Sequence, residues 1–392
     1  MAANATRFST AVDAAVALAV LTISLLTVSA AQASDASGLK LSGDLRMGYL
    51  ASWRDNRDGS ESETDNFRAR LRVRAAADLG NGWQFSTRFA GSYASDQDDF
   101  DFYLRRYRPN GTGVNPGDTT LDELHLGYQH PEQGWRLRLG RFSTAFNLPI
   151  VPGKSLDRND ASNFGIGWTD GVYLQLPIGE NWRGHLIAQA NHRRGTGNTI
   201  RGPLGFSEST SRISGFAALE ATRHPGPFIM RMLSLTWMPD SLAEQGLSQA
   251  ARKDYLTVAA KAAAAWPLGD AGMRLLAAGE IGHAFKRPER QVIGLSGQQQ
   301  VGGNAWQASL NLMDIHPGHN LGAVYGRLQG GWLISNDYRN NDELAEIRYQ
   351  WRPNPDLSME VRYRWRRELE LPAGLERPRR DRDVYARVTL RF

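Results

Sequence analysis

Four arginines occupy alternate positions in one short segment of the chain, at Arg68, Arg70, Arg72 and Arg74. Because side chains alternate between the two faces of a β-strand, a strand here places all four guanidinium groups in one column. A guanidinium group stays charged at physiological pH and offers forked donors to carboxylate or phosphate. The chemistry that this column predicts is the attraction and weak binding of anions.

Further arginines alternate in the same way near the carboxy-terminus. Arg362, Arg364 and Arg366 share one face of a predicted strand, Arg387 lies on one face of the last strand, and Arg138 belongs to an earlier one. If the sheet closes so that its last strand pairs with its first, most of these side chains form one basic wall. Two interpretations of these arginines remain open. They could form structural ion pairs inside a barrel, or they could form a ladder of weak sites along which anions move.

The elements that must position these arginines are predicted to be membrane-spanning strands. The last ten residues, DVYARVTLRF, alternate strictly and end on Phe392, on the apolar face. This ending is typical of the closing strand of an outer-membrane β-barrel, and a soluble edge strand is the alternative. An antiparallel up-and-down barrel of about sixteen strands is predicted, with fourteen to eighteen possible. The predicted strands are residues 38–53, 67–79, 83–95, 121–130, 135–146, 169–178, 182–193, 212–222, 228–238, 255–266, 273–285, 303–313, 320–334, 342–352, 356–367 and 383–392.

The connections between these strands alternate between tight turns and longer polar loops. Short turns such as Asn81-Gly82 are expected on the periplasmic rim, and long loops such as residues 54–66 on the outer rim. Tryptophans fall near the predicted strand ends, as expected for aromatic girdles at the two membrane interfaces. Trp83, Trp135 and Trp182 mark the short-turn rim, and Trp53, Trp237, Trp332 and Trp365 mark the other.

The amino end predicts export. An apolar run at residues 14–28 follows Arg7 and precedes a small-x-small pattern that ends at Ala33. Residues 1–33 are therefore predicted to be a signal peptide cleaved near Ala33, and residues 34–392 a single barrel domain in the bacterial outer membrane. The chain contains no cysteine, so disulfide bonds cannot stabilise it.

The connection at residues 147–168 is unusually apolar for a solvated loop. Burial of its apolar side chains inside the barrel would carry Lys154, Asp157, Arg158 and Asp160 to the narrowest part of the lumen. Opposite charges across such a constriction would create a transverse field. An external loop packed on its neighbours is the alternative.

Other kinds of site find little support in the sequence. The acidic residues at 96–101 lack the glycine and the distal glutamate of an EF-hand, so a solvated loop is predicted and no metal site. No catalytic residues, cofactor or nucleic-acid partner are predicted. An outer-membrane hydrolase remains the alternative from another functional class, because a serine and histidine pair at one rim cannot be identified from sequence.

Four motifs lie within residues 121–176, which are LDELHLGY at 121–128, LRLGRF at 137–142, FNLP at 146–149 and TDGV at 169–172. With these motifs the segment resembles the phosphate-selective porins of Gram-negative outer membranes. The resemblance implies a homotrimeric sixteen-stranded channel with an inward third loop and a basic ladder. Here arginine dominates and lysine is rare, so two solute classes remain open. One is small anionic or polar solutes passing by diffusion, and the other is acidic sugars or polysaccharide, as in alginate-export barrels. Expected partners also include outer-membrane lipid, lipopolysaccharide and the barrel-assembly machinery.

Overall fold

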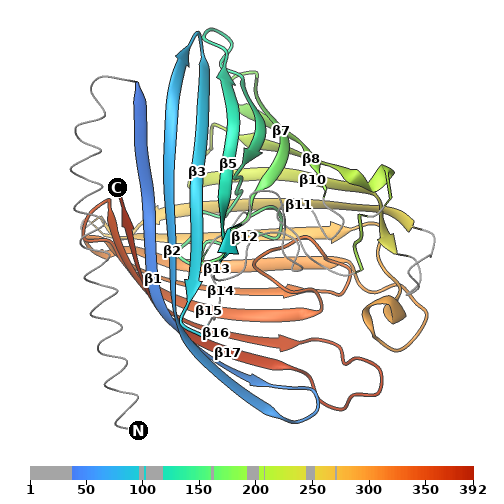
Figure 1. The fold of residues 1–392 in the computed structure, drawn as a ribbon. Coiled ribbons are helices and arrows are strands. Elements are labelled where there is room, and N and C mark those ends of the chain that lie inside the picture. The colour runs from blue at the N-terminus through green and yellow to red at the C-terminus, as the bar shows by residue number, and fades with distance from the viewer. Residues whose placement is uncertain are drawn as a thin grey trace.

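The computed structural model of the chain describes residues 38–96, 101–102, 118–159, 163–191, 203–206, 208–243, 252–269 and 272–392. The predicted signal peptide lies outside these residues. Sixteen long strands and one two-residue strand, β4, form a single sheet (Figure 1). The strands are β1 (Leu39–Asp55), β2 (Glu61–Gly80), β3 (Trp83–Ala94), β4 (Asp101–Phe102), β5 (Asp118–Gln129), β6 (Arg136–Phe142), β7 (Thr169–Ile178), β8 (Trp182–Ala190), β9 (Ile213–Ala221), β10 (Phe228–Ala243), β11 (Arg252–Pro267), β12 (Arg274–Ala284), β13 (Asn304–His316), β14 (His319–Leu328), β15 (Asp342–Trp351), β16 (Leu357–Glu368) and β17 (Arg380–Arg391).

The sheet closes on itself. Each long strand pairs antiparallel with its sequence neighbours, and β17 pairs with β1 in a register that sets Asp44 opposite Arg391. Closure removes both sheet edges, so every long strand has a partner on each side. The predicted sixteen-stranded antiparallel barrel is confirmed. Short 3-10 helices, η1 (Thr210–Arg212) and η2 (Arg290–Ile293), lie in two of the connections.

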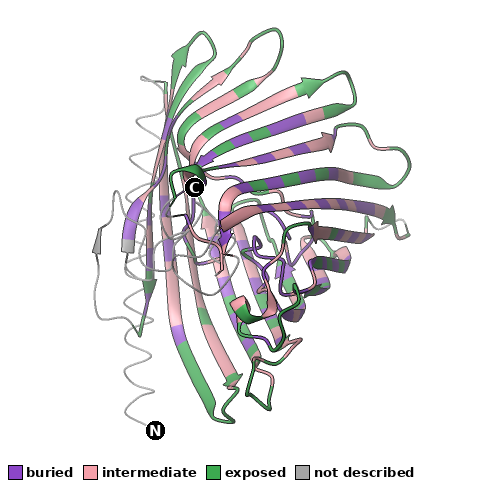
Figure 2. Cartoon of the chain, turned by 90° about the vertical axis from the view of Figure 1, so that its right-hand side faces the viewer, coloured by how far each residue is buried: buried purple, intermediate pink, exposed green. Residues whose placement is uncertain are grey.

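Burial alternates along the strands, as Figure 2 shows in its purple and green bands. Exposed large apolar side chains form the outer wall, and the residues between them point into the barrel. Trp83, Trp182 and Trp266 are exposed near the short-turn rim, and Trp237 is exposed toward the long-loop rim. Among the described residues, no helix is long and apolar enough to cross a membrane.

Three predicted boundaries differ most from the structure. Residues 54–66 are mostly paired, because β1 and β2 continue as a long hairpin whose turn is only residues 56–60. The strand predicted at 228–238 extends to Ala243, and two register irregularities explain its uneven alternation. The strand predicted at 320–334 ends at Leu328, and the chain then leaves the wall.

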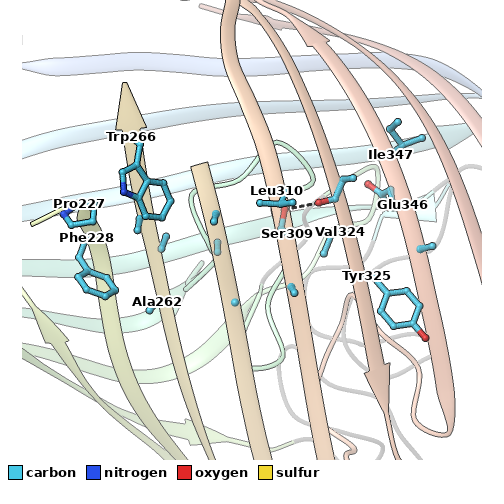
Figure 3. Close-up of a pocket in the computed structure, with 18 of the residues that line it drawn as sticks. Pro227, Phe228, Ala262, Trp266, Ser309, Leu310, Val324, Tyr325, Glu346 and Ile347 are labelled. Atoms are coloured by element: carbon cyan, nitrogen blue, oxygen red, sulfur yellow. Dashed lines mark hydrogen bonds between the residues drawn. The ribbon is translucent and has the colours of Figure 1, made fainter. Parts of the chain in front are cut away.

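The outer wall carries an apolar groove, with a volume of about 820 Å³, along β11 to β15. Small outward-facing residues such as Ala262 form its floor. Larger side chains border it, with Trp266 and Phe228 in one part and Tyr325 in another (Figure 3). The groove therefore faces the lipid and not the lumen.

Candidate functional site

The inner face of the barrel has an apolar part and a basic part. The apolar part lies on β10 to β15, where small or apolar side chains such as Ala263 point inward. These side chains form one buried cluster with Leu156 and Trp332, which come from two connecting segments, residues 147–168 and residues 329–341. Both segments therefore contact the inner wall.

Glycines in the wall allow this close contact. A Cβ atom at Gly282 would overlap the ring of Trp332, and a Cβ atom at Gly322 would lie 2.8 Å from the Cβ atom of Val151. Larger residues at these two positions would displace the segments, so the glycines leave the room that these side chains fill.

A buried ionic cluster fixes the 147–168 segment to β11 and β12. The Lys261 ammonium lies 2.8 Å from Glu280 and 3.4 Å from Asp157, and all three side chains are nearly inaccessible to solvent. Glu280 also accepts hydrogen bonds from the backbone N–H of Leu156 at 2.9 Å and from the Gln307 amide at 2.6 Å. Glu280 is thus paired with one cation and also accepts hydrogen bonds from neutral donors. We call Asp157, Lys261 and Glu280 the anchor cluster.

The other predicted constriction residues are also held by partners. Lys154 is buried and lies 2.9 Å from Glu346. Burial lowers the pKa of Lys154 to about 8, although the nearby Glu346 carboxylate opposes this shift. Arg158 donates hydrogen bonds to Gln189 at 2.6 Å and to neighbouring hydroxyl groups. Asp160 lies outside the described residues.

The inward course of the 329–341 segment was not predicted from the sequence. The Trp332 indole donates to the carbonyl oxygen of Leu156 at 3.0 Å, and the Asp337 carboxylate accepts from the backbone N–H of Ser155 at 2.9 Å. Trp332 therefore does not belong to the outer aromatic girdle, and its assignment there was wrong. The consecutive apolar residues at 332–334 break the strand alternation, and this was the available signal.

The basic part of the inner face lies on β15 to β17 and on β1 to β3. Arginines outnumber carboxylates in this region of the inner face, and two of the acids come from the neighbouring strand β5. The arginines include Arg46, Arg68, Arg70, Arg72, Arg74, Arg88, Arg348, Arg362, Arg364, Arg366 and Arg387, and the carboxylates include Asp44, Asp122, Glu123, Asp342, Glu346, Glu360 and Asp383. We call this region the basic wall.

The members of the arginine column on β2 have partners in the barrel wall. Three of its members form ion pairs, and Arg68 donates a hydrogen bond to Asn66 at 2.8 Å. The ion pairs join Arg70 to Asp44 at 2.8 Å, Arg72 to Asp122 at 3.0 Å and Arg74 to Glu123 at 3.4 Å. Structural pairing therefore accounts for part of the column.

A bulge in β5 supplies two of these acids. Its register shifts opposite Arg88 and Phe89, so the consecutive residues Asp122 and Glu123 are both buried. Arg88 bridges them, at 2.7 Å from Asp122 and 2.6 Å from Glu123. Strict alternation would have placed only one of the two on the inner face.

The end of the 147–168 segment lies against the basic wall. Arg46 donates to the carbonyl oxygen of Asn163 at 2.9 Å, and Arg70 donates to that of Gly165 at 3.2 Å. Arg387 donates to the side-chain oxygen of Asn163 at 2.6 Å. Arg70 is consequently 0% exposed. Neutral oxygen atoms of the protein occupy positions where an anion could accept the same hydrogen bonds.

The arginines of β16 and β17 are partly paired. Arg362 and Arg364 share Asp383, with Arg364 at 2.7 Å. Arg366 donates to the carbonyl oxygen of Asp337 at 2.9 Å but forms no ion pair with a described carboxylate. The Arg138 guanidinium lies 5.6 Å from the ring centre of Tyr173, also without an ion pair in the described part of the chain.

A polar cavity of about 240 Å³ lies where the two segments meet the basic wall. It is lined by six cationic side chains and one carboxylate, together with apolar and amide groups. The cationic residues are Arg68, Lys154, Arg348, Arg362, Arg364 and Arg366, and the carboxylate belongs to Asp337. The arrangement can bind a small anion by several guanidinium groups at once. In the described ranges, no group of three or more histidine or acidic side chains is placed to hold a metal ion.

Comparison with known proteins gives one family and a set of similar folds. The family described as Gram-negative porin matches residues 14–202. OprB of Pseudomonas putida is 12% identical, with 91% of this chain and 94% of that chain covered and a TM-score of 0.58. The outer membrane channel DcaP of Acinetobacter baumannii is 13% identical, with 90% and 97% covered and a TM-score of 0.54. OpdL of Pseudomonas aeruginosa is 14% identical, with 90% and 98% covered and a TM-score of 0.52.

No curated protein matches the chain. At these identities the solved structures establish the fold alone, and the sequence resemblance to Gram-negative porins rests on the amino-terminal half. Both findings agree with the barrel geometry and with a location in the outer membrane.

Proposed function

Since this chain is an outer-membrane β-barrel that resembles Gram-negative porins, we propose that it admits small hydrophilic solutes by passive diffusion and prefers anions. The observation that carries this proposal is the polar cavity, where six cationic side chains face one carboxylate. Five of the six are arginines, which stay charged at physiological pH, so most of the preference would persist over the physiological range.

The division of the inner face supports the same proposal. The two inward segments cover the apolar part, which leaves the basic wall as the polar surface available to a solute. Because many guanidinium groups there are already shared with carboxylates, each would hold a passing anion weakly. Conduction requires binding of this kind, favourable enough for entry and weak enough for release.

We assign different roles to the residues first grouped as pore-lining or constricting. Arg68, Arg138 and Arg366 lack ion pairs with described carboxylates, so their charge would act on solutes most directly. Lys154, Asp157 and Arg158 are buried and paired, so they would hold the constricting segment in place.

Further properties of a porin belong to the proposal. We propose export with removal of residues 1–33, delivery to the barrel-assembly machinery through the strand that ends at Phe392, and assembly as a homotrimer. The apolar groove on β11 to β15 supports a close contact between copies, since small side chains permit near approach of two barrels.

The test is a proteoliposome swelling assay with two solutes of similar size, neutral sorbitol and anionic gluconate. Wild-type barrels should admit gluconate faster, and the variant Arg68→Gln/Arg138→Gln should lose this advantage while sorbitol entry stays unchanged. The matched control is Arg223→Gln/Arg274→Gln, which removes two exposed arginines that pair with Glu180 and Asp314 near the short-turn rim. Equal rates for the two solutes in the wild type would refute the anion preference. Entry of oligomeric uronic acids at the same rate would favour the channel for acidic polysaccharide.

A further inference from the structure

Six charged residues form one row across the outer wall near the long-loop rim. Strand register places them directly opposite one another on β14, β15, β16, β17, β1 and β2. In that order they are Arg327, Glu343, Arg367, Arg380, Asp55 and Glu61. Their sequence neighbours such as Leu328, Leu344 and Arg366 are buried, so the row faces away from the lumen. We call it the outer charged row.

The next outward-facing row toward the membrane contains aromatic residues. Trp365 lies opposite Arg382, which in turn lies opposite Trp53 on β1. Below them the wall continues with apolar side chains such as Val384 and Tyr363. Tryptophan marks the interface between hydrocarbon and headgroups. The outer charged row therefore lies at headgroup depth. Because the long loops of such barrels face the outside, this depth corresponds to the outer leaflet.

Arg367 and Arg380 form a like-charged pair in adjacent strands. Directly opposite residues have Cβ atoms about 4.5–5.5 Å apart, and like charges at this spacing destabilise a sheet. Both side chains are exposed, and neither forms an ion pair or side-chain hydrogen bond with a described residue. Glu343, opposite Arg367, instead accepts a hydrogen bond from the Tyr325 hydroxyl at 2.6 Å.

Arg382 brings a third guanidinium group to the same place. It lies diagonally from Arg367, and its only described partner is Asp55 at 3.3 Å, with 49% of its side chain still exposed. Three guanidinium groups thus meet on two strands, and the described part of the chain leaves the opposed pair without a counter-ion. Glu343 and Asp55 flank this pair in the row but form no ion pair with it, so both guanidinium groups can still bind an anion from the surroundings.

We propose that Arg367, Arg380 and Arg382 bind the phosphate group of a phosphorylated glycolipid in the outer leaflet. A phosphate dianion can accept forked hydrogen bonds from two guanidinium groups, which matches the opposed pair. Trp365 and the apolar wall beneath it would contact the sugar and the acyl chains. The site lies outside the barrel, so it stands independently of the proposed channel function.

The experiment is native mass spectrometry of the purified barrel in detergent, titrated with bis-phosphorylated lipid A or with the same glycolipid after phosphatase treatment. The wild type should retain the phosphorylated form, and Arg367→Gln/Arg380→Gln should bind it at least about tenfold more weakly, because charge-assisted hydrogen bonds are lost. The control Arg223→Gln/Arg274→Gln removes equal charge at the opposite rim and should bind like the wild type. Heat-modifiable migration on gels shows that each variant is folded.

Three results would overturn the proposal. Equal retention by the wild type and Arg367→Gln/Arg380→Gln would show that these arginines do not bind the glycolipid. Equal binding of the dephosphorylated glycolipid would show that acyl chains alone make the contact. Displacement of the phosphorylated glycolipid by an equimolar amount of inorganic phosphate would show a site for the free anion and not for a lipid.

Discussion

Replacing Lys261 with methionine should release the 147–168 segment from the inner wall. Lys261 is the one cation within 4 Å of both Asp157 and Glu280 in the described chain. Methionine keeps much of the side-chain length but leaves two carboxylates buried together without a cation. Breaking a buried ion pair by removing one partner typically costs about 3–5 kcal/mol, because an uncompensated charge stays buried. The lower value corresponds to a roughly hundredfold increase in the population of the displaced segment.

Thiol labelling can measure this population, because the natural chain has no cysteine. A single Val151→Cys substitution places a thiol in the segment at a position that is only 7% exposed. Its labelling rate should rise by about a hundredfold when Lys261→Met is added, if labelling requires displacement of the segment. Lys286→Met is the matched control, because Lys286 is half-exposed and lies 3.7 Å from Asp254, outside the anchor cluster. Similar labelling rates with and without Lys261→Met would refute the anchoring role.

Two other predictions concern the constriction and barrel closure. Lys154 is protonated below its pKa of about 8 and neutral above it, so anion preference should decrease between pH 7 and pH 9. Planar-bilayer recordings should show no such step in Lys154→Met, and a pH-independent wild type would contradict the assignment. Gly43→Ala should impair assembly, because a Cβ atom there would lie 2.5 Å from the Phe392 ring where the last strand meets the first. A normal yield of heat-modifiable barrel would count against this contact.

The architecture was predictable because closed barrels impose one simple pattern. Each strand needs an apolar face toward lipid, so the period-two alternation also identified the inward-facing arginines on β2 and β16. The terminal Phe392 and the turn at Asn81-Gly82 marked strand ends for the same reason. These features depend on neighbouring residues in the sequence and on the bilayer alone.

The partners of the inward-facing residues could not be predicted in the same way. The pairing of Arg72 with Asp122 depends on the bulge in β5, and alternation gives no indication of a bulge. The anchor cluster joins residues that are over a hundred positions apart, such as Asp157 and Lys261. Trp332 was misassigned because a tryptophan at a strand end can turn toward lipid or toward the lumen, and only tertiary packing decides between them.

The zero-current potential of the wild-type channel in a KCl gradient tests the central claim most directly. The excess of positive charge on the basic wall predicts a potential that shows preference for chloride, and this preference should weaken at 1 M salt as the Debye length falls to about 3 Å. In the variant Arg68→Gln/Arg138→Gln, the zero-current potential should shift toward the equilibrium potential of potassium. A wild-type channel that prefers potassium at low salt would contradict the proposed anion preference.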